Sequence, residues 1–256
     1  MTGGSIRYGI EGRVFLVTGA SRGIGLAIAR ELVEQGVSLA ICARKQEGLD
    51  EAVKLLGGRE KVLAIQAHIA KEEDVERMFS EVLGRFGRLD ALVNNVGMNL
   101  LTPSVADTDT VLWQKILDTN LNGTFLCSRA AARIMRQNKR GKIVTVSSIA
   151  GRRASPGMGV YGIAKAAVEM LTRVLAAELA PFNIQVNAVA PSMVRTEFSR
   201  PFWSDPAIYE QVARAIPMGR IAETTDVVHP VLFFTSDGSD FITGQTLLVD
   251  GGASAV

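Results

Sequence analysis

Short apolar runs alternate with helical patterns along most of the chain, and this alternation limits the possible folds more than any other feature. The apolar runs cover residues 14–18, 37–43, 61–67, 89–95, 142–148, 184–190 and 246–250. Helical patterns lie between them, near 23–35, 46–56, 71–87, 108–138 and 159–180. Runs that are apolar on both faces are typical of parallel strands covered by helices on both sides. The sequence therefore predicts an α/β protein with a doubly wound, seven-stranded parallel sheet and helices on both faces.

One segment, residues 192–223, interrupts this alternation. It follows a strand, at the carboxyl edge of the sheet, where ligands bind in folds of this kind. Its apolar side chains suit the lining of a pocket: Met193, Phe198, Phe202 and Trp203. We interpret the segment as a substrate lid; the alternative is an insertion that only covers the core. No linker or repeat divides the 256 residues, so we expect a single domain over residues 1–256.

Charge and composition exclude several classes of function. The net charge is +2 and Lys and Arg form no dense cluster, which argues against a nucleic-acid partner. No run approaches the ~18 apolar residues of a membrane span, and residues 1–13 lack the apolar core of a signal peptide. Cys42 and Cys127 lie in apolar runs, so we expect buried free thiols and a reducing compartment. With only two histidines, no metal is expected, and these features favour a soluble cytoplasmic protein.

A glycine-rich loop, TGASRGIG, follows the first strand and opens the first helix. Glycines let the backbone approach a pyrophosphate, and the helix N-terminus supplies unpaired N–H groups and a positive dipole. The candidate cofactor residues in this loop are Gly19, Ser21, Arg22, Gly23, Ile24 and Gly25. Because a strand precedes the loop and a helix follows it, we predict dinucleotide binding in a Rossmann-like sheet.

The end of the second strand discriminates between NAD(H) and NADP(H). An acidic residue there would bind the ribose 2′-hydroxyl of NAD, but the sequence continues with Arg44 and Lys45. Arg22, inside the glycine loop, adds another cation. Converging cationic groups favour a 2′-phosphate, so NADP(H) is the predicted cofactor; the alternative is that these are ordinary surface arginines.

The stretch YGIAK places Tyr161 and Lys165 four residues apart on a predicted helix, where their side chains share one face. A phenol has a pKa of ~10, and a nearby ammonium group is expected to lower it toward working pH. Tyr161 is then a usable acid for a ketone oxygen or a base for an alcohol. Such a pair also occurs by chance in buried helices, so the pair alone decides little.

The motifs together resemble the short-chain dehydrogenase/reductase family over roughly residues 12–252. Gly19, Gly23 and Gly25 match its TGxxxGIG motif, and Ser148 stands 13 residues before Tyr161, at the family's spacing. The resemblance implies a catalytic set of Asn120, Ser148, Tyr161 and Lys165. In that set the tyrosine donates the proton, the serine orients the substrate oxygen, the lysine lowers the tyrosine pKa and holds the nicotinamide ribose, and the asparagine holds a relay water. Ser147 is then a structural neighbour and Asn122 a bystander.

Further cofactor contacts follow from the same resemblance. The stretch NNVG is similar to the family's NNAG, which borders the cofactor, and the segment after the sixth strand faces the nicotinamide carboxamide. The residues implied are Asn95, Val96, Gly97, Pro191, Val194 and Thr196. Two positions depart from the family pattern. His68-Ile69 replaces an Asp followed by an apolar residue beside the adenine, and Ser192 replaces a glycine.

The expected activity is an NADPH-dependent carbonyl reductase that runs in reverse as an alcohol dehydrogenase on a small-molecule substrate. The alternative is a 3-oxoacyl-[acyl-carrier-protein] reductase, whose acidic carrier protein would need a basic patch. Candidates for that patch are Arg195, Arg200, Arg214 and Arg220. A non-catalytic NADP-binding sensor is the alternative from a different class. Since tetramers predominate in the family, the resemblance also implies a homotetramer.

Overall fold

Seven parallel strands form one sheet in the computed structural model, which describes residues 6–255. The strand order is β3-β2-β1-β4-β5-β6-β7. The strands are β1 (Val14–Thr18), β2 (Ser38–Ala43), β3 (Val62–Gln66), β4 (Ala91–Asn94), β5 (Gly141–Val146), β6 (Ile184–Pro191) and β7 (Thr246–Val249). Every residue of β1, β5 and β6 is buried, as expected for strands that are covered on both faces.

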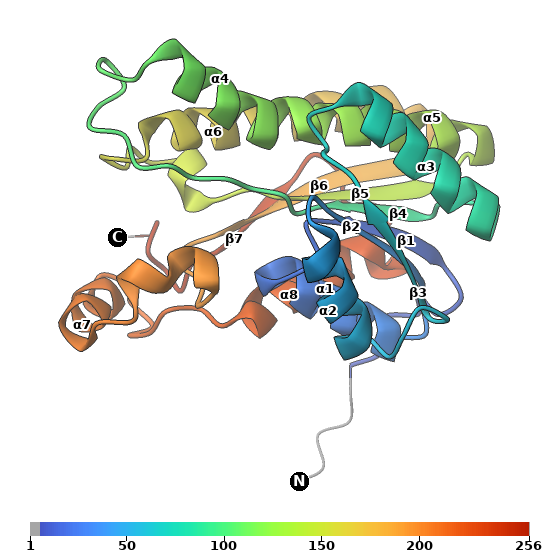
Figure 1. Cartoon of the computed structure of the whole chain (residues 1–256), viewed down its shortest axis with the longest axis horizontal. Coiled ribbons are helices and arrows are strands. Elements are labelled where there is room, and N and C mark those ends of the chain that lie inside the picture. The colour runs from blue at the N-terminus through green and yellow to red at the C-terminus, as the bar shows by residue number, and fades with distance from the viewer. Residues whose placement is uncertain (1–5, 256) are drawn as a thin grey trace, which may run out of the picture.

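Helices cover both faces of the sheet, so the predicted doubly wound fold is confirmed (Figure 1). On one face lie α1 (Gly23–Glu34), α2 (Gln46–Leu55) and α8 (Thr224–Thr235), whose buried side chains form one apolar cluster with the sheet. On the other face α3 (Glu72–Phe86), α5 (Gly123–Asn138) and α6 (Gly159–Leu179) form a second cluster. Helix α4 (Thr110–Leu117) runs beside α6.

The order of the strands positions the candidate site. From β1 the chain builds outward through β2 to β3, and then returns to place β4 on the other side of β1. The loops after β1 and β4 therefore diverge, which opens a crevice at the carboxyl edge of the sheet. The glycine loop, Asn95 and the end of β5 all lie at this edge.

Three features of the chain were not predicted. Helix α8 carries Pro230 within it and is apolar on most sides, so it shows no clear helical period. Helix α7 (Pro206–Arg214) lies inside the segment interpreted as a lid. The helical pattern over 108–138 forms two helices, α4 and α5, joined by a π-helical turn, Asp118–Asn122.

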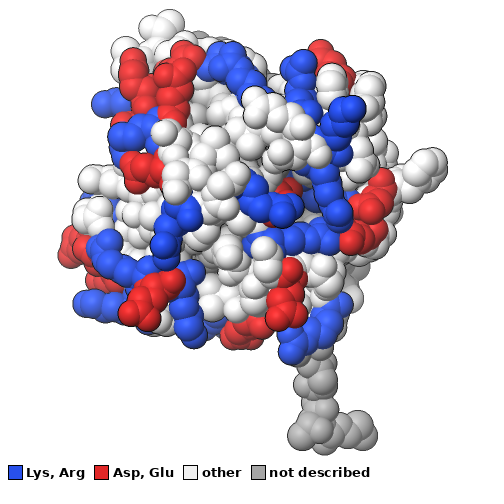
Figure 2. All heavy atoms as spheres, turned by 90° about the vertical axis from the view of Figure 1, so that its right-hand side faces the viewer, with Lys and Arg blue, Asp and Glu red and all other residues white. Residues whose placement is uncertain are grey.

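Some compositional predictions can be compared with the structure. Cys42 and Cys127 are both buried free thiols, as expected. Within residues 6–255 no helix combines the length and the apolar character needed to cross a bilayer. Figure 2 shows one face of the molecule, where Lys and Arg are interspersed with Asp and Glu and with uncharged surface.

Candidate active site

The glycine loop has the shape of a phosphate cradle. Gly19 and Gly23 have φ values of +67° and +59°, in the left-handed region that side chains other than glycine rarely adopt. A Cβ at Gly25 would overlap Asn95 Nδ2 and the carbonyl oxygen of Gly19. Because α1 begins at Gly23, its first N–H groups point into the crevice without intrahelical partners. These residues therefore fit the pyrophosphate of a dinucleotide.

Hydrogen bonds from Asn95 connect the end of β4 to this loop. Asn95 Nδ2 donates to the carbonyl oxygens of Thr18 and Gly19, both at 3.1 Å. The backbone N–H of Asn95 donates to Thr18 Oγ1 at 3.0 Å. Asn95 thus shapes the cradle through its side chain, and Val96 packs against Gly19. Thr18 was not named as a site residue from the sequence, although it opens the TGASRGIG motif.

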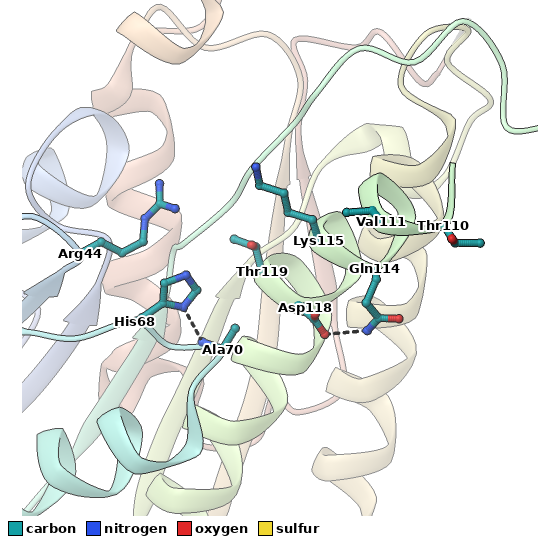
Figure 3. A pocket seen from close by; sticks show the side chains of 9 residues that line it. All are labelled: Arg44, His68, Ala70, Thr110, Val111, Gln114, Lys115, Asp118 and Thr119. Atoms are coloured by element: carbon teal, nitrogen blue, oxygen red, sulfur yellow. Dashed lines mark hydrogen bonds between the residues drawn. The ribbon is translucent and has the colours of Figure 1, made fainter. Parts of the chain in front are cut away.

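Three cations lie in the loops after β1 and β2. Arg22, Arg44 and Lys45 are exposed, and within residues 6–255 none of their side chains forms an ion pair. A pocket of about 730 Å³ opens beside Arg44, between the ends of β2 and β3 and the outer face of α4 (Figure 3). Its lining is Arg44, His68, Ala70, Thr110, Val111, Gln114, Lys115, Asp118 and Thr119.

His68, which replaces the family's Asp after β3, and the apolar Ile69 that follows it behave differently. His68 lines the pocket, and its Nδ1 accepts a hydrogen bond from the backbone N–H of Ala70 at 3.3 Å. The side chain of Ile69 is buried and packs against Gly123 at the start of α5. Only the backbone of Ile69 is therefore in a position to contact a cofactor.

The side chains of Tyr161, Lys165 and Ser148 come together beside the end of β5. Lys165 is 3% exposed, and its Nζ donates to the carbonyl oxygen of Val146 at 2.9 Å. The same Nζ lies 5.6 Å from the centre of the Tyr161 ring. Ser148 follows β5 and caps the short helix Ile149–Gly151 by accepting from the N–H of Ala150. The predicted shared face of Tyr161 and Lys165 is therefore present.

Asn120 reaches the same place from the π-helical turn. Its side chain is fully buried: Nδ2 donates to the carbonyl oxygens of Met98 and Ile116, and Oδ1 accepts from the N–H of Met98. A Cβ added to Gly97 would lie 3.5 Å from Lys165 Nζ and 3.6 Å from Asn120 Oδ1. Gly97 thus separates the lysine and the asparagine. π-Helical turns within helices occur frequently at functional sites.

Burial shifts the pKa values of Tyr161 and Lys165 in the directions that favour their neutral side chains. It raises the pKa of Tyr161 to about 12, although hydrogen bonding with Ser148 acts in the opposite direction. It lowers the pKa of Lys165 to about 8. The tyrosine shift is opposite to the expected lowering by Lys165, because loss of solvent around the phenol outweighs the hydrogen bond with Ser148.

The segment after β6 lies next to the glycine loop. A Cβ added to Gly23 would be 3.6 Å from Thr196 Cγ2, so Thr196 borders the cradle. Pro191 ends β6, and the backbone of buried Val194 pairs with Ala222. The segment continues as a short helix, Glu197–Phe202, and as α7, which project from the carboxyl edge of the sheet (Figure 1).

The four arginines considered for a carrier-protein patch all lie near acidic partners. Arg220 binds Asp226 with two hydrogen bonds of 2.6 and 2.9 Å, and Arg214 binds Glu210 at 3.0 Å. The remaining two are paired more loosely, Arg200 with Glu197 at 3.5 Å and Arg195 with Glu223 at 3.7 Å. Each of these arginines therefore has an acidic neighbour within the chain that a carrier protein would have to compete with.

A glycine cradle at the switch point of a doubly wound sheet, with a tyrosine–lysine pair at the same edge, defines a dinucleotide-dependent oxidoreductase. A family model described as "Enoyl-(Acyl carrier protein) reductase" matches residues 19–254. Dehydrogenase/reductase SDR family member 4 of Bos taurus is 37% identical over 96% of this chain and 89% of its own length. The chain belongs to the short-chain dehydrogenase/reductase family.

Two further similarities bear on the chemistry. The 3-oxoacyl-[acyl-carrier-protein] reductase FabG of Staphylococcus epidermidis is 39% identical over 93% of this chain and 97% of its own length. The solved structure of a gluconate 5-dehydrogenase from Burkholderia cenocepacia J2315, in complex with NADP and tartrate, has a TM-score of 0.91 and 32% identity. The match spans 98% of this chain and 98% of the gluconate 5-dehydrogenase chain.

Proposed function

We propose that this protein is an NADP(H)-dependent carbonyl reductase that also oxidises the corresponding secondary alcohol. The observation that carries the proposal is the convergence of Tyr161, Lys165, Ser148 and Asn120 from three segments at the edge that holds the glycine cradle. A phenol beside a hydroxyl and an ammonium group suits proton transfer to a carbonyl oxygen.

The cradle and the cations around it support NADP(H) as the cofactor. Gly19, Gly23 and Gly25 leave room for the pyrophosphate, and Arg22 and Arg44 suit a 2′-phosphate. The gluconate 5-dehydrogenase neighbour binds NADP, which agrees with this choice. We further assign the nicotinamide end to the segment from Pro191 through Val194 to Thr196. When bound, the nicotinamide supplies or accepts the hydride.

The roles of the protein's own residues follow from their positions. Tyr161 is the acid in reduction, because burial keeps its phenol protonated at neutral pH. Ser148 holds the substrate oxygen next to the phenol. The Lys165 ammonium stabilises the phenolate left after proton transfer. Asn120, across Gly97 from Lys165, holds the water through which the proton is replaced.

Two observations bear on the substrate. The relative FabG is named as a 3-oxoacyl-[acyl-carrier-protein] reductase, which keeps a β-ketoacyl thioester as the second candidate. The acid partners of Arg195, Arg200, Arg214 and Arg220 weaken it, because an acidic carrier protein would have to compete with them. An apolar ketone enclosed by the lid, residues 192–223, is therefore the preferred substrate class.

The first experiment measures NADPH oxidation with an acetoacetyl thioester and an aromatic ketone or diketone, at equal concentrations. A higher kcat/KM for the ketone supports the proposal. A strong preference for the thioester would replace it with acyl-chain reduction. Turnover of neither, together with tight NADPH binding, would favour the sensor alternative.

The variant Tyr161→Phe separates an enzyme from a sensor. Removing the only proton donor is expected to lower kcat by a factor of about 10² to 10⁴, while NADPH affinity changes little. Stopped-flow rates and NADPH fluorescence titration measure the two quantities. A Tyr161→Phe protein with wild-type turnover would contradict the catalytic assignment.

We also propose a homotetramer in the cytoplasm. Exposed apolar side chains on the helical face and beyond α8, among them Val111 (77% exposed), Met170 and Phe241, agree with burial against other copies. The two free thiols agree with a reducing compartment. Light scattering of the purified protein and imaging of a fluorescent fusion test these two points; a monodisperse monomer would overturn the first.

A further inference from the structure

A buried carboxylate lies behind the candidate active site, on the same helix as its tyrosine and lysine. Glu169 follows Lys165 by one turn of α6, and its side chain is only 5% exposed. Its Oε2 accepts from Arg152 Nε at 2.8 Å, and its Oε1 accepts from Ser147 Oγ at 3.2 Å. A carboxylate is rarely buried without a partner or a role, so this network needs an explanation.

The three residues lie in or next to two of the segments that carry the candidate catalytic groups, the end of β5 and α6. Ser147 is the residue before Ser148 at the end of β5. Arg152 lies in the connection between Ser148 and Tyr161, and Glu169 lies on the helix of Tyr161 and Lys165. The Ser147 hydroxyl is also 3.3 Å from the carbonyl oxygen of Lys165. The network thus joins neighbours of each catalytic residue on α6 and β5.

Close backbone packing makes this connection sensitive to small shifts. A Cβ at Gly151 would lie 2.9 Å from the backbone of Lys165 and Ala166, and a Cβ at Gly162 would lie 2.6 Å from the carbonyl oxygen of Ala150. The segment that follows Ser148 is therefore pressed directly against α6, with glycines at the points of contact. Displacement of this segment would change the distance between Ser148 and Tyr161.

We propose that Glu169 is a positioning residue, whose carboxylate holds Arg152 and Ser147 and thereby fixes Ser148 against the turn of α6 that carries Tyr161 and Lys165. The role of those three residues rests on the proposed function. Two acceptor oxygens are required, one for the guanidinium and one for the hydroxyl. A glutamine keeps one acceptor oxygen for the guanidinium, but its amide group can only donate to the Ser147 hydroxyl, so it removes the negative charge that faces Arg152 and reverses the second hydrogen bond.

The test compares Glu169→Gln with Glu178→Gln. Glu178 lies on the same helix but is exposed, and within residues 6–255 it forms no ion pair, so it is the matched control. We expect Glu169→Gln to lower kcat for ketone reduction by about tenfold or more, because small displacements of reacting groups are costly. NADPH affinity should stay within about twofold, and the control should keep wild-type values in both.

Two further variants test the network itself. Arg152→Gln and Ser147→Ala each remove one partner of Glu169, and both should lower kcat in the same direction. The double variant Arg152→Gln/Glu169→Gln should lose little more than the larger single loss, because the two side chains act through one contact. If the kcat losses of the two single variants instead add up in the double variant, the two side chains do not act through one network. If Glu169→Gln does not fold, Ser147→Ala and Arg152→Gln decide the question.

Hydrogen exchange of residues 147–165 provides a readout that does not depend on turnover. Faster exchange in Glu169→Gln than in Glu178→Gln is expected. Unchanged exchange with unchanged kcat, or an equal loss of kcat and NADPH affinity, would overturn the inference. Failure of the proposed function looks different: the wild-type protein would reduce no carbonyl, while the exchange comparison would still report whether Glu169 holds this segment.

Discussion

Burial acts on the tyrosine–lysine pair in opposite directions, and both shifts favour the neutral side chains. The pKa of Tyr161 is raised to about 12, so its phenol keeps its proton through the neutral range. The pKa of Lys165 is lowered to about 8, so its ammonium group loses its proton just above neutral pH. Reduction needs the protonated phenol at the start and the ammonium at the end of proton transfer.

These shifts predict how the reduction rate depends on pH. The rate should fall as pH rises through about 8, because neutral Lys165 no longer stabilises the phenolate, while Tyr161 is still protonated. Measurement of kcat between pH 6 and 10 at saturating NADPH checks this. In Lys165→Arg the cation stays charged throughout, so the decline near pH 8 should be absent, even if the rate is lower. A flat wild-type profile would contradict the assignment.

Among the elements, we propose that the glycine loop and the end of β2 set cofactor preference. Arg22 precedes α1 and Arg44 follows β2, so both lie in loops at the carboxyl edge of the sheet. Neither has an acidic partner within residues 6–255, which leaves both available to a phosphate.

Removal of one of these cations should weaken the binding of NADPH but not the binding of NADH. We expect Arg44→Ala to raise KM for NADPH by about tenfold or more, since a hydrogen bond to a charged group contributes about 1.5–3 kcal/mol. KM for NADH should change by less than about twofold. Arg30→Ala, an exposed arginine on α1, is the control. An equal rise in both KM values would show that Arg44 does not contact the 2′-phosphate.

Arg195 connects parts of the segment that we interpret as a lid, residues 192–223. Arg195 lies over the rings of Trp203 and Tyr209, at 5.3 and 5.6 Å, and so connects the strand end to the two lid helices. Trp203 Nε1 in turn donates to the carbonyl oxygen of Thr196 at 3.0 Å. The lid is thus tied to the residue that borders the cradle.

Loss of this contact should loosen the lid. Arg195→Ala removes two cation–π contacts of about 0.5–1 kcal/mol each, so we expect KM for the ketone to rise severalfold and residues 196–214 to exchange faster. Arg200→Ala, in the same segment and only loosely paired, should leave both unchanged. Faster exchange with an unaltered ketone KM would show that this segment does not enclose the substrate.

At the scale of the whole molecule, the two edges of the sheet carry different kinds of side-chain contact. The carboxyl edge carries the candidate site, whereas the amino edge is held by ion pairs. Arg13 and Arg140 both bind Asp237, and buried Lys142 binds Asp240 at 2.6 Å. Burial lowers the pKa of Lys142, and the partner carboxylate opposes that shift.

A substitution at the amino edge should therefore lower the stability of the protein without changing its activity. Asp240→Ala leaves the Lys142 ammonium buried and unpaired, so we expect the free energy of unfolding to fall by about 2 kcal/mol. This is less than for a fully buried pair, because the Asp240 side chain is 57% exposed. Urea denaturation measures the change, and kcat should be unaffected. Adding Lys142→Met should recover stability; no recovery would show that the loss does not come from the unpaired lysine.

Local pattern alone determined much of this protein. The apolar runs identified all seven strands. Burial on two faces explains the pattern in β1, β2, β4, β5 and β6, whereas the edge strands β3 and β7 are partly exposed. The four-residue spacing placed Tyr161 and Lys165 on one face, because helix geometry is local. Helix α8 escaped prediction, since a helix that is apolar on most sides has no period to read.

Tertiary structure decided the rest. Only the folded chain places Thr196 beside Gly23, gives each candidate patch arginine an acid partner, and buries Glu169 between Ser147 and Arg152. It also reversed the expected shift of the Tyr161 pKa. Periodicity records whether a side chain is buried, but its pKa and its hydrogen-bond partners depend on groups from distant segments, and residue order does not specify which of those groups become neighbours.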